Sequence, residues 1–203
     1  MKNLLIIFTR NIELGKCKTR LAKTVGPQIA LDIYIFLVEH TSVISKNLTS
    51  QKWVFYSEHK ASGDLFNDDI YEKYCQEGRD LGERMHNAFQ LGFEKGFEKI
   101  IVIGSDIYDL EESDLNKAFK ALDDAEYVLG PAQDGGYYLL GMKTPNAKLF
   151  ENKSWGTDKV LDETLETIKG SEVFLLDQRN DVDTYHDIKD EAVFQKFLKD
   201  WEG

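Results

Sequence analysis

Two short, continuously apolar runs constrain the fold of this chain more than any other feature. They are "LLIIF" at residues 4–8 and "KIIVIGSD" at residues 99–106, and the second ends in small residues and an acid. A run without polar alternation predicts a strand that is buried on both faces, and such strands belong to parallel sheets covered by helices on both sides. These two segments therefore predict the centre of an α/β sheet.

Segments with strand and helix patterns alternate along the rest of the chain. Strands are predicted at residues 4–8, 52–57, 99–106, 125–132, 137–143 and 172–177. Helices are predicted to begin at Pro27, at the capping-box pair Asp80 and Glu83, and after Ser113. Two further helices are predicted around Leu161–Ile168 and from Tyr185 to Trp201, the latter after Thr184. This alternation predicts a mainly parallel central sheet flanked by helices, in a single domain spanning residues 1–203.

The composition limits the classes of partner that the protein is expected to bind and indicates its cellular compartment. The net charge of -11 over 203 residues argues against nucleic-acid or anionic-membrane binding, because phosphate backbones select basic faces. A small phosphorylated ligand needs only a local basic cluster, so it stays compatible with this charge. Cys17 and Cys75 form no CxxC pair, and the apolar run near the start is too short for a secretory signal. We therefore expect the cytoplasm.

A basic loop follows the first predicted strand. Arg10, Lys16, Lys18 and Arg20 lie close together with Gly15 in an otherwise acidic chain. Ligands of open α/β sheets bind beyond the carboxyl ends of the strands, where guanidinium groups and backbone amides suit phosphate oxygens. The loop is therefore a candidate diphosphate site, and a solvated basic loop is the alternative. No GxxxxGK[ST], GxGxxG, GxSxG or zinc spacing occurs, which argues against P-loop ATPases, Rossmann dehydrogenases and serine hydrolases of the GxSxG type.

Carboxylates follow two other predicted strands. Asp106 comes directly after the buried run at 99–105, and Asp181 and Asp183 follow the last strand two residues apart. In an extended segment the latter two would point the same way and could share Mg²⁺ or Mn²⁺ with Asp106. Helix capping is the alternative for all three, and Asp109 is a further candidate ligand or cap.

The stretch "GPAQDGGYYLLG" at residues 130–141 separates two predicted strands with an acid and two glycines. Gly135 and Gly136 permit a positive φ and the close approach of a ligand. Asp134 is a candidate acid or base, metal ligand or acceptor-binding group, and a simple turn aspartate is the alternative. Tyr137 is a candidate wall of the same site.

Six segments taken together resemble a known family. "GKCKTRLA", "QEGRDLGERM", "IGSDIYDL", "GPAQDGGYYLLG", "WGTDKVL" and "DVDT" are similar, in this order, to the bacterial glycosyltransferase-like proteins called rSAM/selenodomain-associated transferase 1. The resemblance covers residues 4 to about 188. It implies the nucleotide-diphosphosugar transferase (GT-A) fold and a likeness to small-molecule nucleotidyltransferases.

The resemblance also implies roles for individual residues. Lys18 and Arg20, with Arg10, would hold nucleotide phosphates, and a segment containing Gln76, Gly82 and Arg84 would lie near the nucleotide. Asp106 would be the metal-binding acid of the DxD type, and Asp183 would lie near the metal or the donor phosphates. Asp134 would line the transfer site, beside a substrate loop of Gly135, Gly136, Tyr137 and Trp155, and it is the candidate catalytic group.

The function predicted on these grounds is a metal-dependent glycosyltransferase. It would use Mg²⁺ or Mn²⁺ and move a sugar from a nucleoside diphosphate sugar to a small-molecule acceptor. Two alternatives stay open: a guanylyltransferase-like nucleotidyltransferase that releases pyrophosphate, and a non-catalytic nucleotide-binding module. The donor base, the sugar, the acceptor and any homo-oligomer are not readable from the sequence.

Overall fold

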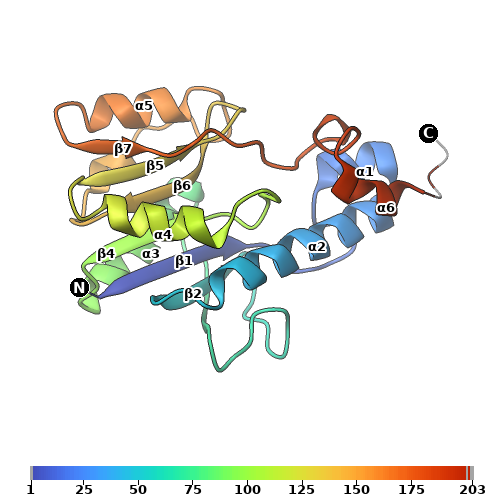
Figure 1. The fold of residues 1–203 in the computed structure, drawn as a ribbon, viewed down its shortest axis with the longest axis horizontal. Coiled ribbons are helices and arrows are strands. Elements are labelled where there is room, and N and C mark those ends of the chain that lie inside the picture. The colour runs from blue at the N-terminus through green and yellow to red at the C-terminus, as the bar shows by residue number, and fades with distance from the viewer. Residues whose placement is uncertain (1, 200, 202–203) are drawn as a thin grey trace.

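A seven-stranded sheet in the order β3-β2-β1-β4-β6-β5-β7 forms the centre of the protein (Figure 1). The computed structural model describes residues 2–199 and 201. The strands are β1 (Asn3–Thr9), β2 (Gln51–Tyr56), β3 (Glu72–Cys75), β4 (Lys99–Ile103), β5 (Tyr127–Pro131), β6 (Tyr137–Met142) and β7 (Val173–Leu175). The α-helices are α1 (Thr19–Val25), α2 (Pro27–Ser45), α3 (Leu81–Glu94), α4 (Glu112–Ala121), α5 (Val160–Thr167) and α6 (Gln195–Leu198).

Most neighbouring strands run parallel, as the sequence predicts. β1 pairs in parallel with β2 and β4, β2 with β3, and β5 with β7. β6 is the exception, because it runs antiparallel to both β4 and β5. The predicted α/β class with a mainly parallel sheet is therefore confirmed.

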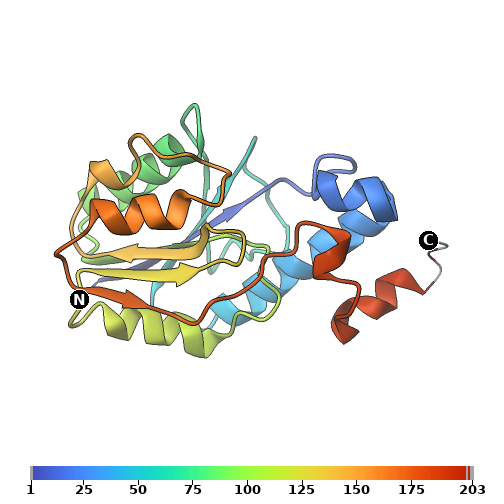
Figure 2. The same cartoon turned by 90° about the horizontal axis from the view of Figure 1, so that it is seen from above.

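Helices cover both faces of the sheet (Figure 2), and each face buries a separate apolar layer. Alternate residues of β1 show the division, because Leu5 and Ile7 face α2 and α4 whereas Leu4 and Ile6 face α3. The central strand is fully buried on both sides, which explains why its sequence has no polar alternation.

A third apolar cluster lies beyond the carboxyl end of β1, where α1 and the first half of α2 meet the C-terminal segment, elements that lie together in Figure 1. Its fully buried residues include Leu21 of α1, Leu37 of α2, and Val182, Ile188 and Phe194 of the C-terminal segment. This cluster holds the basic loop and the C-terminal acids close to the end of β1.

The structure corrects two predictions about helices. The stretch from Tyr185 to Trp201 is not one helix: it forms two 3-10 turns, Tyr185–Asp187 and Ala192–Phe194, before the short α6. Ile188 and Phe194 are both fully buried, whereas a continuous α-helix would place residues six apart roughly 120° from each other. Ser113 does not cap α4, because the helix begins after Glu111, whose backbone N–H donates to Asp114.

Two elements were not predicted. The strand Glu72–Cys75 lies at the edge of the sheet and has no apolar run. The helix Thr19–Val25 lies inside the basic loop and buries only Leu21 and Val25. Among the described helices, none has the length and apolar character that crossing a bilayer requires.

Gly141 at the centre of β6 provides a test of the packing between β5 and β4. A Cβ at this position would lie 2.5 Å from Val128 Cγ1 and 2.9 Å from Ile101 Cγ1. We expect Gly141→Ala to lower the free energy of unfolding by about 1–3 kcal/mol, the usual cost of overpacking. Urea denaturation measures this value.

The double variant Gly141→Ala/Val128→Ala is the control for that prediction. Because Val128→Ala removes the nearest obstructing methyl group, the two losses should be less than additive. Strictly additive losses would show that the methyl group at Gly141 does not collide with Val128.

Candidate active site

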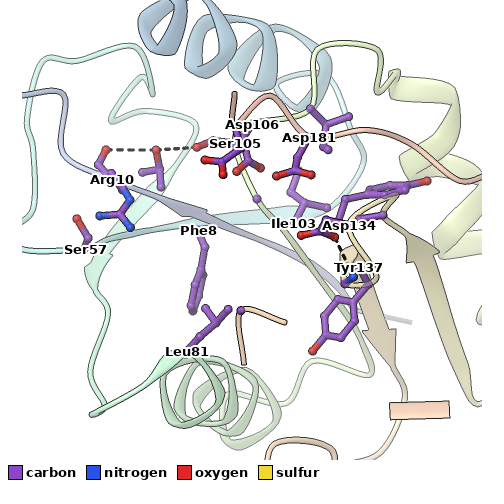
Figure 3. A pocket seen from close by; sticks show the side chains of 18 of the residues that line it. Phe8, Arg10, Ser57, Leu81, Ile103, Ser105, Asp106, Asp134, Tyr137 and Asp181 are labelled. Atoms are coloured by element: carbon purple, nitrogen blue, oxygen red, sulfur yellow. Dashed lines mark hydrogen bonds between the residues drawn. The ribbon is translucent and has the colours of Figure 1, made fainter. Parts of the chain in front are cut away.

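A cavity of about 540 Å³ opens at the edge of the sheet where β1 and β4 end and β6 begins (Figure 3). Most of the residues predicted from sequence line it, namely Arg10, Lys18, Gln76, Arg84, Asp106, Asp134, Gly136, Tyr137, Trp155 and Asp183. Arg20, Gly82 and Gly135 do not line it. Segments far apart in the sequence therefore converge on one site.

A buried network of hydroxyl groups ties the ends of β1 and β4 together under the cavity. The Tyr34 hydroxyl of α2 accepts a hydrogen bond from the Arg10 backbone N–H at 2.7 Å. It also lies 2.9 Å from Thr9 Oγ1 and 3.2 Å from Ser105 Oγ, and Ser105 donates to Thr9 at 3.1 Å. The network fixes the backbone from which the Arg10 and Asp106 side chains extend.

Lys18 is a buried cation that faces this site. It caps α1 with a left-handed backbone (φ 46°), and its side chain is only 8% exposed. Its Nζ lies 3.2 Å from Oδ2 of Asp106. Burial acts to lower the pKa of the Lys18 ammonium, but Asp106, Asp181 and Asp183 outweigh burial, so that the pKa is raised and the group stays charged.

The segment after β7 brings two more acids to the cavity. Val182 donates its backbone N–H to the Asp106 carbonyl at 3.0 Å and buries its side chain. Asp181 and Asp183 therefore both lie on the cavity side, as their spacing predicts, and both line the cavity. Arg20, at the rim, pairs with Asp183 at 2.8 Å.

Asp181 is a cavity acid with a perturbed ionisation. Burial first, and then the nearby carboxylates of Asp106 and Asp134, together raise its pKa to about 6. The cavity therefore gathers more negative charge than Lys18 neutralises. Asp109, the other candidate ligand, lies away from these acids and pairs with Arg179 at 2.7 Å.

The loop between β5 and β6 is shaped by its glycines. Asp134 Oδ1 accepts the Gly136 backbone N–H at 2.8 Å, which is an Asx-type turn. Gly135 has a φ of +87°, and a Cβ there would collide with the backbone of Asp158. The Gly135 carbonyl accepts the N–H of Leu161 at 2.9 Å, so the "DGG" and "WGTD" segments lie against each other.

The segment from the end of β3 to the first turn of α3 carries the other predicted nucleotide residues. Gln76 donates through Nε2 to the Phe55 carbonyl at 2.9 Å, and Arg84 Nε donates to the Gly78 carbonyl at 3.1 Å. Gly82 is buried under Trp155, and a Cβ there would lie 2.5 Å from the indole Nε1. Gly82 therefore allows Trp155 to pack closely against α3.

The cavity contains residues that the sequence motifs did not predict. Tyr34 lies in the middle of α2, in an apolar pattern that gives no signal of a polar role. Thr9 ends β1 and Ser105 lies two residues after the end of β4, and their position was the only available signal. Of the two acids in the last acidic run, the resemblance singled out Asp183, whereas both Asp181 and Asp183 line the cavity.

The carboxylates of the cavity suit a divalent cation that is shared with a substrate. Among residues 2–199 and 201, the only group of three ligand-type side chains within single-ion distance is Glu13, Glu58 and His59. Lys16 already pairs with both glutamates of that group, at 2.8 and 3.0 Å. Asp106, Asp181 and Asp183 line one cavity, but their carboxylate oxygens do not all lie within single-ion distance of one another, so a cation there would take one or two of them together with substrate phosphates.

Solved structures define the class of this fold. A proposed nucleotide-diphospho-sugar transferase from Desulfovibrio desulfuricans G20 is 29% identical, with a TM-score of 0.86 over 98% of this chain and 95% of that chain. A cytidylyltransferase from Leptospira borgpetersenii serovar Hardjo-bovis is 14% identical (TM-score 0.59, 92% and 83% covered). Rv0371C of Mycobacterium tuberculosis H37Rv, in complex with manganese, is 12% identical (TM-score 0.58, 98% and 100% covered).

The fold is thus that of the nucleotide-diphospho-sugar transferases and nucleotidyltransferases, and the expected enzyme class, a transferase, is confirmed. Residues 41–157 match the family described as "Uncharacterized protein conserved in bacteria (DUF2064)", and the chain belongs to that family. A search of curated proteins finds no match to the chain.

The hydroxyl network predicts a specific effect of Tyr34→Phe. The change leaves the Arg10 N–H without its partner at 2.7 Å, and such a loss costs about 1–3 kcal/mol of unfolding free energy. We also expect weaker binding of nucleoside diphosphate, because the Arg10 backbone is released. Urea denaturation and calorimetry measure the two effects.

Tyr71→Phe is the matched control. The Tyr71 hydroxyl is also buried and lies 2.8 Å from Ser45 Oγ, but it does not line the cavity. A similar loss of stability with unchanged nucleotide affinity is expected. If both variants bind nucleotide equally well, the Tyr34 network does not organise the site.

Proposed function

We propose that this chain is a metal-dependent glycosyltransferase that moves a sugar from a nucleoside diphosphate sugar to a small-molecule acceptor. The observation that carries the proposal is the pairing of buried Lys18 with Asp106 in a cavity that Asp134, Asp181 and Asp183 also line. A buried ammonium beside carboxylates suits a diphosphate that arrives with a divalent cation. The 29% identity to a proposed nucleotide-diphospho-sugar transferase supports the same reaction class.

The cationic side of the cavity would bind the donor. Lys18 and Arg10 extend from the end of β1 and α1, and Gln76 and Arg84 line the cavity beside the end of β2. Arg20 would reach a phosphate only by leaving Asp183, so we assign it a supporting role at the rim. The ammonium of Lys18 would stabilise the charge that develops on the leaving diphosphate.

Asp134 would accept the proton of the acceptor hydroxyl. Its Oδ1 is held by the Gly136 N–H at 2.8 Å, which leaves Oδ2 available to the acceptor. Asp106 with Asp183, and with Asp181 beside them, would hold the cation. When bound, Mg²⁺ or Mn²⁺ would supply positive charge to the donor diphosphate.

Product analysis tests this proposal directly. The protein is incubated with a panel of nucleoside diphosphate sugars and Mn²⁺, and free nucleoside diphosphate is measured. The fold likeness to a cytidylyltransferase makes nucleotidyl transfer the second candidate. Pyrophosphate released from nucleoside triphosphates, with no nucleoside diphosphate from the sugars, would replace the first candidate by the second.

We further propose a reducing compartment, the cytoplasm, and one catalytic domain for the chain. Both cysteines are free among the described residues. Cys17 is buried and its thiol donates to the Asn11 carbonyl at 3.1 Å, and burial raises the pKa of this thiol. Cys17 is therefore a packed structural residue rather than a nucleophile.

Asp106→Asn tests the metal role. The Asn carbonyl can still accept from Lys18, so the fold should survive, but the carboxylate ligand is lost. We expect the gain in nucleoside diphosphate affinity that Mn²⁺ provides to fall by at least about tenfold, equivalent to ~1.4 kcal/mol. Calorimetry with and without Mn²⁺ measures this gain. Asp109→Asn, which removes an acid that faces Arg179, should leave the gain unchanged.

Asp134→Asn tests the proton acceptor. The amide oxygen preserves the turn to Gly136 but cannot act as a base, so donor binding should persist while turnover falls by ~10²–10⁴. The control is Asp158→Asn in the adjoining loop, whose side chain does not line the cavity. Near-normal turnover in a folded Asp134→Asn protein would make Asp134 a turn residue only.

A further inference from the structure

The two sides of the cavity differ in chemistry. One side carries Lys18 and the carboxylates, whereas the other is lined by apolar side chains. That apolar wall consists of Phe8, Leu81, Met85, Tyr137, Trp155 and Val160. In Figure 3, Phe8, Leu81 and Tyr137 lie on the opposite side of the pocket from Asp106 and Asp181.

The apolar wall is held beside the "DGG" loop by backbone contacts. Trp155 packs on Gly82 of α3, and the segment that follows Trp155 packs on Gly135 through Asp158. The bond from Leu161 N–H to the Gly135 carbonyl closes the same junction. A molecule that presents a hydroxyl to Asp134 therefore has the rest of its atoms against this wall.

The cation next to the apolar wall, Arg84, is one that we assign to the donor. Arg84 belongs to the same helix, but its guanidinium is turned toward the Gly78 carbonyl and Gln76, at 3.1 and 3.4 Å. The hydroxyl of Tyr137 has only a 4.0 Å contact with Met85 Sδ, so it keeps the capacity to bond to a ligand. Burial raises the pKa of Tyr137 far above its ordinary value, so this phenol is neutral.

We infer that the acceptor is a neutral small molecule that carries a hydroxyl group on an apolar, alkyl or ring-sized body, rather than a phosphorylated or polyhydroxylated compound. The inference rests on the proposed glycosyl transfer, because Asp134 defines which side of the cavity the acceptor takes. Leu81 is 46% exposed at the edge of the cavity, and an apolar ligand would cover it. A phosphate on this side would lose its hydration and would have to compete with the donor for Arg84.

The test is a binding experiment with matched probes on the full chain. Ligand-observed NMR titrations compare benzyl alcohol, glycerol and benzyl phosphate in the presence of nucleoside diphosphate and Mn²⁺. We expect benzyl alcohol to bind at least tenfold more tightly than the other two. Leu81→Ser should weaken the binding of benzyl alcohol roughly tenfold, because losing a methylene group from an apolar contact changes affinity by about that factor. Leu81→Phe should restore the affinity.

Phe174→Ser is the control, since Phe174 is an exposed apolar residue of β7 that does not line the cavity. Equal weakening in this control, or tighter binding of glycerol or benzyl phosphate, would overturn the inference. If Leu81→Ser weakens nucleoside diphosphate and leaves benzyl alcohol unchanged, the wall holds the nucleoside instead. If the proposed function is wrong, no donor will release nucleoside diphosphate. That result is independent of the probe titrations, which can still be measured.

Discussion

The contact between buried Lys18 and Asp106 is the interaction on which the candidate site depends. An ammonium removed from water is costly unless opposite charges compensate for it, and the surrounding aspartates supply that compensation. Lys18 is held beside Asp106 because α1, which begins next to it, packs into the third apolar cluster beyond β1. This cluster therefore supports the contact between the two charges. The acids, in turn, exceed the single ammonium, which leaves the cavity suited to a further cation.

This local arrangement explains how an acidic protein can bind an anionic ligand. The net charge of -11 describes the whole surface, whereas a diphosphate would meet the few cations that line the cavity. Because the Debye length at physiological ionic strength is about 8 Å, distant surface charges are largely screened from such a ligand. The sign of the overall charge is therefore no argument against a nucleotide ligand.

The sequence predicted the parts of the fold that have a simple signal. β1 and β4 were predicted because buried central strands need continuous apolar runs, and Asp106 and Asp134 because strand ends carry sites in α/β sheets. β3 was not predicted, because an edge strand with half-buried residues has no such run. Tyr34 could not be recognised, because its role depends on a helix crossing the ends of two strands, and spacing along the chain does not encode that.

The reversed strand β6 explains why Asp134 shares an edge with Asp106. β6 is antiparallel to both β4 and β5, so β5 runs in the same direction as β4 and ends at the same edge. The loop that joins β5 to β6 therefore lies beside the end of β4. β7 is parallel to β5 and delivers Asp181 and Asp183 to the same edge. With every other strand parallel, a single antiparallel insertion thus places the proposed base, the proposed metal ligands and Lys18 around one cavity.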